Sequence, residues 1–390
     1  MLAIVPSLNK FFLVEAGKAI PMYVTSEIET LENRVTNSPR QLVLLLTNNC
    51  NLACQYCYEF SMSRESGVMP LNLIDSAIEQ LFNESAKENR KSVKLTLFGG
   101  EPTLAWDRLL YSVNKARELE LIHSIPLRIS LVTNGVTKRD FSLVLESIDH
   151  FTISIDGPPE IQNKLRPIKD GSHSSGILAR TIGLLFSKVP KKLTFRITLT
   201  PDTLNHFAEI ADYLFRLYPG IPQSYEPIMP TTRLEETVAV QTFFDTFLQL
   251  VRKYSPLKQI IHTSLFSLTP SMSFCGMERR TVVFPNGELS GCHRVNAENA
   301  DDPVLRYFGY GAMTNGSNAS NQDGISNARE ATLTGKLGQA CEECFAKYYC
   351  RGGCPALKLG LGGTPFQRHP WCNSIRHFYI EYFLRKLADS

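Results

Sequence analysis

The amino-acid sequence predicts an α/β protein with a partial (β/α)6 TIM-like barrel of parallel strands and a separate cysteine-rich C-terminal domain. Three observations support this prediction. Apolar, strand-like runs alternate with helical segments over the first half of the chain. Glycine-containing and polar motifs follow the strand-like runs, where parallel α/β folds place their active sites. The ten cysteines form two groups, separated by a cysteine-free stretch from residue 58 to residue 274.

The elements are predicted from hydrophobic periodicity, taken in chain order. The apolar run that leads to Cys50 indicates a buried strand, and the other predicted strands end in glycine-containing turns or at a proline. Strands are predicted within residues 41–50, 92–102, 127–135, 150–157 and 192–201. Helices are predicted within residues 76–89, 140–148, 175–189 and 236–254. The chain beyond Cys275 is rich in loops.

Composition and charge exclude several classes of protein. The chain has 390 residues, 43% of them hydrophobic and 20% charged, as expected for a globular enzyme. A net charge of +3 is too small to indicate a nucleic acid or a membrane surface as the partner. No apolar run reaches eighteen residues, and the N-terminus lacks a secretion signal. We therefore expect a cytoplasmic protein, in which clustered cysteines bind metal more often than they form disulfides.

The first cysteine group has the spacing C-x3-C-x2-C and comprises Cys50, Cys54 and Cys57. This motif after a predicted strand resembles the signature of the radical S-adenosylmethionine (SAM) superfamily. The resemblance implies that three thiolates hold a 4Fe–4S cluster and that SAM binds the fourth iron. The alternative is a structural zinc site, but zinc favours four protein ligands and no further Cys or His follows closely.

Further strand-end motifs resemble the SAM-binding segments of the same superfamily. The sequence FGGEP resembles its GGE motif, in which backbone groups and the Glu side chain receive the SAM amino group. The resemblance also implies that Ser154 contacts the ribose, that Arg166 binds the carboxylate and that Tyr56 lies near the adenine. Asn134 and Asp156 are candidates that are equally explained as turn residues. The expected SAM-binding residues are Tyr56, Gly99, Gly100, Glu101, Pro102, Asn134, Ser154, Asp156 and Arg166.

The second cysteine group is similar to the seven-cysteine pattern of the SPASM domain. Cys275 is followed by eleven residues, Gly287, four residues and Cys292, and the run CEECFAKYYCRGGC has the spacing C-x2-C-x5-C-x3-C. The resemblance implies two auxiliary 4Fe–4S clusters, and therefore three clusters in all. One would use Cys275, Cys292 and Cys354, with a fourth ligand that the sequence does not identify. The other would use Cys341, Cys344, Cys350 and Cys372. A zinc ribbon or a disulfide-rich tail is the alternative.

The resemblance divides the chain into four expected parts. Residues 1–40 form an N-terminal extension, 41–232 a radical SAM core, 233–272 a helical linker and 273–390 a SPASM domain. Two short strands are expected within residues 9–17 and 20–26. These strands could pair with a substrate leader peptide by strand addition, or the extension could pack on the barrel.

The implied activity is that of a radical SAM oxidoreductase that modifies a ribosomally made precursor peptide. The leading hypothesis is a side-chain crosslink, either carbon–carbon, as in a cyclophane, or thioether. An anaerobic sulfatase-maturing enzyme, which makes formylglycine, is the alternative. It is disfavoured because His293 stands where those enzymes carry an Asp base, and because an eighth SPASM cysteine is absent.

A non-catalytic iron–sulfur scaffold or electron carrier is a third alternative. The expected partners are the peptide and a flavodoxin- or ferredoxin-type reductant. Candidate substrate contacts are Arg196, Tyr225 and Glu226, each of which is also explained as a surface ion pair.

Overall fold

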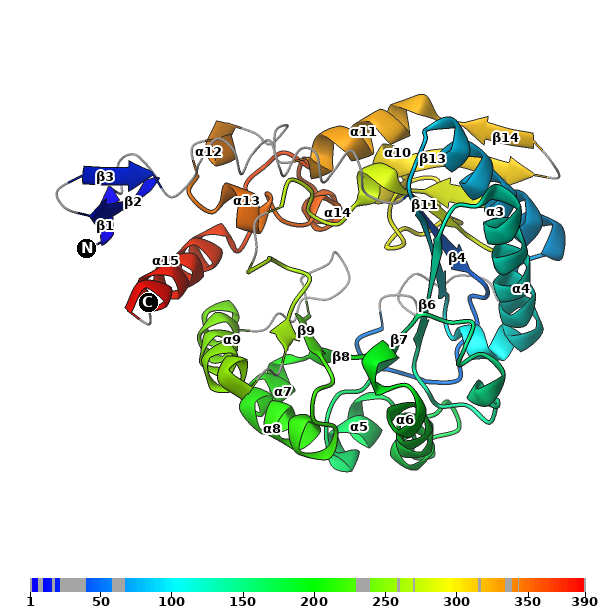
Figure 1. Ribbon diagram of the computed structural model, residues 1–390, viewed down its shortest axis with the longest axis horizontal. Helices are drawn as coiled ribbons and strands as arrows, with labels where there is room; N and C mark the ends of the chain where they lie inside the picture. Colours follow the sequence, from blue (N-terminus) through cyan, green and yellow to red (C-terminus); the bar gives the residue numbers. More distant parts are fainter. Residues whose placement is uncertain are drawn as a thin grey trace.

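The computed structural model describes residues 2–5, 10–15, 18–21, 40–57, 67–228, 239–257, 260–268, 271–314, 317–333, 339–342 and 344–388. Its centre is a curved sheet of eleven strands in the order β10-β9-β8-β7-β6-β5-β4-β11-β12-β13-β14 (Figure 1). Strands β4 to β9 are parallel and follow chain order, as a barrel built from βα units requires. The predicted α/β barrel fold is therefore confirmed.

The core alternates strands with helices. Its strands are β4 (Arg40–Leu45), β5 (Val93–Phe98), β6 (Leu127–Thr133), β7 (His150–Ser154), β8 (Leu193–Leu199) and β9 (Gln223–Pro227). Its helices are α3 (Leu71–Lys87), α4 (Trp106–His123), α5 (Pro159–Leu165), α6 (Ser175–Lys188), α7 (Pro201–Leu204) and α8 (Phe207–Leu217). The helices cover the convex side of the sheet (Figure 1). Alternate strand residues, such as Leu95 and Leu97 of β5, are fully buried beneath them.

The helix predicted within residues 140–148 is absent. The structure has a single 3-10 turn, Phe141–Leu143, capped by the Asp140 side chain, which accepts a hydrogen bond from the Ser142 amide. Val144 then leaves the helical region with φ −125° and ψ 0°. Phe141 and Val144 still pack into the core at helical spacing, so the periodicity that predicted a helix comes from burial alone.

The C-terminal part extends the same sheet. Strand β11 (Arg280–Val283) runs parallel to β4, and β12 (Glu288–Ser290), β13 (Gly309–Thr314) and β14 (Ser317–Ser320) continue it antiparallel. At the opposite edge, β10 (Ile261–His262) pairs with β9. The remaining helices are α9 (Val240–Tyr254), α10 (Pro303–Phe308), α11 (Gln322–Thr332), α12 (Gln339–Glu342), α13 (Lys347–Cys350), α14 (Pro355–Gly360) and α15 (Cys372–Ala388). The expected domain limits stay predictions, because the sheet crosses them.

Aromatic packing joins the C-terminal helix α15 to α9. The Phe378 ring of α15 packs at an angle against the rings of Phe244 and Phe247 of α9, with ring centroids 5.5 and 6.1 Å apart. Phe266, from the loop after β10, contacts the same rings. This cluster fixes the C-terminal helix beside α9, where Figure 1 shows it.

The N-terminal residues form a small antiparallel sheet of their own. Its strands are β1 (Leu2–Val5), β2 (Lys10–Glu15) and β3 (Lys18–Pro21). The first expected strand is present as β2, and β1 is an additional strand. β3 overlaps the second expected strand only at residues 20–21, and the rest of that prediction lies outside the described residues. Pairing with a leader peptide stays a prediction. No helix in the described part of the chain is long and apolar enough to cross a membrane.

Candidate active site

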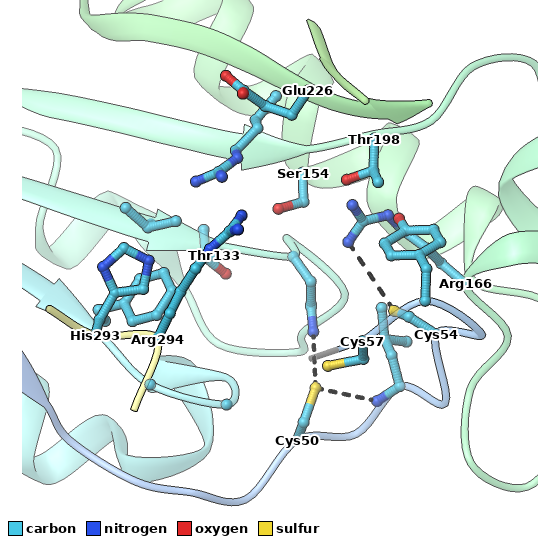
Figure 2. Close-up of a pocket in the computed structure, with 18 of the residues that line it drawn as sticks. Cys50, Cys54, Cys57, Thr133, Ser154, Arg166, Thr198, Glu226, His293 and Arg294 are labelled. Atoms are coloured by element: carbon cyan, nitrogen blue, oxygen red, sulfur yellow. Dashed lines mark hydrogen bonds between the residues drawn. The ribbon is translucent and has the colours of Figure 1, made fainter. Parts of the chain in front are cut away.

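A cavity of about 190 Å³ lies at the C-terminal ends of the core strands (Figure 2). Its walls come from the loop after β4, from strands β5 to β9 and from the loop after β12. The residues around it are Cys50, Leu52, Cys54, Tyr56, Cys57, Phe98, Gly99, Gly100, Val132, Thr133, Asn134, Ser154, Arg166, Arg196, Thr198, Glu226, Pro227, Ile228, His293 and Arg294. Parallel strands thus bring side chains from distant parts of the sequence to one place.

The three cysteines of the first group stand together on one side of this cavity (Figure 2). The Leu52 amide donates to the Cys50 sulfur at 3.4 Å, and the Asn134 amide nitrogen approaches the same sulfur at 3.7 Å. The Arg166 guanidinium approaches the Cys54 sulfur at 4.0 Å. Donors and a cation directed at sulfur stabilise thiolates, which are the form that binds iron.

These thiols suit a cluster better than a single ion. Within the described residues, no three His, Cys, Asp or Glu side chains converge closely enough to hold one metal ion. Burial raises the pKa of Cys50 to about 11 and that of Cys54 to about 12, so both thiols keep their protons at neutral pH until a metal replaces them. Three thiols spaced around a cavity fit a 4Fe–4S cluster that bridges them, and leave its fourth corner to a ligand in the cavity.

The FGGEP turn packs directly on the cysteine loop. The Gly100 amide donates to the Thr47 carbonyl at 2.8 Å, and the Glu101 amide donates to the Asn49 carbonyl at 2.7 Å. A Cβ on Gly99 would overlap the Thr47 carbonyl oxygen, and one on Gly100 would overlap the Asn49 carbonyl oxygen. Only glycine therefore permits this close approach, which places the backbone of both residues on the cavity wall.

The Glu101 side chain is not placed as expected. It is fully buried away from the cavity, and its carboxylate accepts hydrogen bonds from the Thr103 amide, the Thr133 hydroxyl and the Asn134 amide at 3.0, 2.7 and 2.7 Å. Burial raises its pKa. Glu101 therefore ties the FGGEP turn to the end of β6, and it is not among the residues that line the cavity. Pro102, the first residue of the following 3-10 turn, also lies outside the cavity lining.

Asp156 is likewise a supporting residue and not part of the cavity wall. It is fully buried, and its carboxylate receives the Arg166 guanidinium through two hydrogen bonds of 2.8 and 3.2 Å. The Tyr56 hydroxyl also donates to it, and the Arg166 guanidinium carbon lies 5.3 Å from the Tyr56 ring centroid. Burial alone would lower the pKa of Arg166, but the Asp156 carboxylate outweighs this effect and raises it. Asp156 therefore holds a permanently charged Arg166 and the Tyr56 ring at the cavity.

Of the three candidate substrate contacts, two line the cavity. Arg196 and Glu226 are on its wall, and the Glu226 carboxylate accepts hydrogen bonds from the Ser224 hydroxyl at 2.8 Å and the Ser264 amide at 2.9 Å. The prediction for Tyr225 is wrong. Tyr225 is next to Glu226 on β9, so its side chain lies on the opposite face of the sheet. Its ring is buried on the helix side, with its centroid 4.4 Å from that of the Phe207 ring of α8.

Sequence reasoning missed several lining residues. Thr198 follows Arg196 by two positions on β8 and is directly opposite Glu226 on β9, so strand alternation could have identified it. Arg294 also lines the cavity, but it comes from the loop after β12, and no local pattern places that loop against β5. The ring of its neighbour His293 packs against the Phe98 ring in a tilted orientation, with ring centroids 5.3 Å apart. The C-terminal region thus completes the cavity.

The remaining cysteines form two sets in the C-terminal region. Cys341, Cys344, Cys350 and Cys372 surround a small cavity of about 20 Å³. Cys275, Cys292 and Cys354 lie close enough for their charges to interact, and burial raises the pKa of Cys275 and Cys292, the latter to about 12. These sets coincide with the two that the SPASM resemblance implies. The second lacks a fourth cysteine.

Comparison with known proteins is consistent with this geometry. The sequence family described as the radical SAM superfamily matches residues 44–214. A cysteine-type anaerobic sulfatase-maturating enzyme of Clostridium novyi is 32% identical over 367 residues, which is 87% of this chain and 93% of the relative. A second such enzyme, from Clostridium perfringens, is 23% identical over 384 residues, which is 89% of this chain and 97% of that protein.

A solved structure has the same fold over nearly the whole chain. It is that of native anSMEcpe with bound AdoMet and peptide, and it superposes with a TM-score of 0.70 at 20% identity, covering 90% of this chain and 98% of that one.

Proposed function

The chain belongs to the radical SAM superfamily, and we propose that it is a maturase that oxidises a side chain of a peptide or protein substrate. The observation that carries the proposal is the cavity itself. Three thiols, two glycine backbones and Arg166 face one space at the ends of parallel strands, and a loop from the cysteine-rich region closes it. A non-catalytic electron carrier has no need of a cavity beside three thiols.

Each side chain at the cavity has a proposed task. Cys50, Cys54 and Cys57 hold the 4Fe–4S cluster, which with SAM supplies, when bound, a carbon radical that removes a hydrogen atom from the substrate. Arg166 is the cation that suits the SAM carboxylate. The backbone beside Gly99 and Gly100 receives the SAM amino group.

The other SAM contacts keep their proposed places on the cavity wall. Ser154 faces the ribose, the Tyr56 ring lies near the adenine, and Asn134 is within reach of Cys50. The two tail cysteine sets are proposed to bind auxiliary clusters and to accept the second electron. A flavodoxin- or ferredoxin-type protein is the proposed donor of the first electron, in the cytoplasm.

We propose formylglycine formation as the specific reaction. The full-length relatives named above favour this alternative over the crosslink that the sequence ranked first. A substrate cysteine would lose one hydrogen atom from Cβ, then one electron and the thiol proton, and water would convert the thioaldehyde to an aldehyde and hydrogen sulfide. His293 lies at the cavity, where it can accept that proton in place of the Asp of the sulfatase-maturing pattern.

Crosslink formation is the second candidate. The specific observation in its favour is the histidine at position 293 together with an auxiliary set of three cysteines, both of which depart from the sulfatase-maturing pattern. A crosslink also needs hydrogen abstraction and the loss of an electron and a proton, so the same cavity serves it. The two reactions differ in the product and not in the first step.

The test uses reconstituted enzyme with SAM, dithionite and two peptides, one with a single cysteine and one with a cysteine and a tyrosine. We expect 5'-deoxyadenosine and an aldehyde that reacts with a hydrazine in both peptides. His293→Ala is expected to keep SAM cleavage and lose the aldehyde, and His293→Asp to retain it. Loss of two hydrogens without an aldehyde would establish the crosslink instead. Absence of 5'-deoxyadenosine in every reaction would contradict the proposal.

A further inference from the structure

The concave face of the sheet carries an unusual set of side chains below the cavity. Phe98, Val132, Ser154 and Arg196 line the cavity, one each from β5, β6, β7 and β8, and so identify the concave face of these strands. Residues two positions apart on a strand lie on the same face of the sheet. Two residues back are Thr96, Ser130, Thr152 and Thr194, and four residues back on β5, β6 and β7 are Lys94, Arg128 and His150.

This pattern differs from an ordinary barrel interior. Closed barrels fill the inside with layers of Val, Ile and Leu. Here the part of the concave face that β5 to β8 contribute is polar below the cavity, and it ends in cations. Apolar residues of this face, Val43, Leu45 and Val282, come from the neighbouring strands β4 and β11. The Arg128 side chain is exposed, and Lys94 and His150 are partly exposed. The polar strip on β5 to β8 is therefore not filled by an apolar core of its own.

The cations are neighbours in register, and none of the described residues provides an acidic partner for Lys94 or Arg128. Lys94 is directly opposite Arg128 in the strand register. On its other side Lys94 is opposite Gln41 of β4, which is in turn opposite Arg280 of β11. Like charges directly opposite one another destabilise a sheet. Within the described part of the chain, neither the Lys94 ammonium nor the Arg128 guanidinium makes an ion pair or hydrogen bond. An external anion that binds between the two side chains would relieve this repulsion.

The electrostatic surroundings of Lys94 and His150 also favour an external anion. Burial lowers the pKa of Lys94, and repulsion by Arg128, Arg280 and Arg279 lowers it further. Burial also lowers the pKa of His150 to about 4, with further repulsion by Arg128, Lys94 and His262, so His150 is a neutral hydrogen-bonding group at pH 7. Among the described residues, the main causes of both shifts are burial and neighbouring Arg, Lys or His side chains.

Lys94 and Arg128 are not explained as counter-charges to the thiolates of the two C-terminal cysteine sets. Arg280 and Arg294 are the cations that lower the pKa of Cys275 and Cys292, respectively, against the larger effect of burial. Neither Lys94 nor Arg128 is among the main causes of the pKa shift of either thiol. They also lie about four strand residues from the cavity, or roughly 13 Å along the sheet, too far to contact a ligand held at the three cysteines.

We propose that Lys94 and Arg128 bind an acidic segment of the peptide substrate, which lies along the concave face and leads the modified residue into the cavity. Arg196, whose side chain makes no ion pair or hydrogen bond within the described residues, stands at the cavity end of this path. An extended peptide rises about as much per residue as a strand. The acidic residues should therefore lie about four positions from the modified residue. The inference rests on the proposed function, because it assumes a peptide substrate.

Binding tests the proposal without any SAM chemistry. The probe is a fluorescein-labelled peptide with three consecutive glutamates four residues from a cysteine, and its matched control has glutamines instead. We expect the Glu peptide to bind the reconstituted protein in a salt-sensitive manner, and the Gln peptide to bind at least tenfold more weakly, on the order of one charge-assisted hydrogen bond. Arg128→Gln and Lys94→Gln should each weaken binding about tenfold.

The control variant is Arg180→Gln, which removes an exposed arginine from α6 on the convex side and should change nothing. The double variant Lys94→Glu/Arg128→Glu should reverse the preference toward a lysine peptide, which a merely unfolded variant cannot do. Equal affinity for the Glu and Gln peptides would overturn the inference. So would an affinity for the Glu peptide that is unchanged in the Arg128 and Lys94 variants. If inorganic phosphate displaced the Glu peptide at the same concentration of negative charge, the inference would also be overturned, and the site would be one for small anions. Failure of the proposed function is separate, since it would appear as absent SAM cleavage.

Discussion

The two best-defined cysteine sets differ in the space that they enclose. Cys50, Cys54 and Cys57 stand beside a cavity of about 190 Å³, whereas Cys341, Cys344, Cys350 and Cys372 surround only about 20 Å³. The set with three thiols thus has more room for a non-protein ligand than the set with four. This difference is consistent with the proposed division, in which substrate chemistry takes place at the first set and the second stores electrons.

The two sets also differ in what positions them. The first follows a parallel strand and is fixed by backbone hydrogen bonds to the FGGEP turn and by the Arg166 guanidinium. The second comes from short helices and loops. There the Arg368 guanidinium donates to the Cys372 sulfur at 3.1 Å, from an exposed position. A change near the first set should therefore affect SAM, and one near the second should affect only electron transfer and local stability.

Removing one thiol from each set should have the largest effect and tests this division directly. Cys54→Ser should abolish 5'-deoxyadenosine formation, because the cluster that SAM requires loses a ligand. Cys372→Ser should lower iron content by about four atoms per chain and block product formation, yet leave SAM cleavage measurable. Chromatography of 5'-deoxyadenosine together with an iron assay distinguishes them. If Cys372→Ser abolished SAM cleavage as completely as Cys54→Ser, the division of roles would be wrong.

Asp156→Asn should have the next largest effect. Asparagine keeps the shape but leaves Arg166 as a buried charge without its partner, at a cost of about 3 kcal/mol in the free energy of unfolding. SAM affinity should fall as Arg166 loses its fixed orientation. Denaturant unfolding and calorimetric SAM titration measure the two effects.

The matched control for Asp156→Asn is Lys164→Gln. Lys164 pairs with Asp202 at 3.0 Å, but both side chains are more than half exposed, at 62% and 71%. This change should cost less than about 0.5 kcal/mol and leave SAM binding intact. Equal effects of the two variants would contradict the account of Asp156.

Two glycine substitutions sharpen the comparison at a smaller scale. Gly100→Ala should weaken SAM binding about tenfold, because the new methyl group overlaps the Asn49 carbonyl and displaces the cysteine loop. Gly353→Ala places a Cβ against the His369 ring at a backbone φ of +76°, so it should destabilise the tail without changing SAM affinity. Calorimetric SAM titration and thermal unfolding separate them. A loss of SAM affinity in Gly353→Ala would show that the two regions are coupled.

The sequence predicted the strands β4 to β8 from local periodicity, and the resemblance to the SPASM spacing implied the cysteine sets. It did not predict β11 to β14, which lie in the part of the chain expected to be rich in loops. It also placed Arg196 and Glu226 correctly, since both lie on the concave phase of their strands. It placed Tyr225 at the cavity, although Tyr225 lies on the face of β9 opposite to that of Glu226. It also assigned ligand contacts to Glu101 and Asp156, whose buried carboxylates accept hydrogen bonds from other groups of the protein. It missed Arg294 because the approach of the loop after β12 to β5 depends on tertiary packing. Residue type indicates the chemistry that is available, but only the fold shows which groups are already occupied.

The most direct test of the central claim is to reconstitute the purified chain anaerobically, count iron and sulfide, and then add SAM and dithionite. The account predicts about twelve irons per chain and formation of 5'-deoxyadenosine, which corresponds to one SAM-binding cluster beside the cavity and two auxiliary clusters. Zinc in place of iron, or a full complement of iron with no cleavage of SAM, would contradict it.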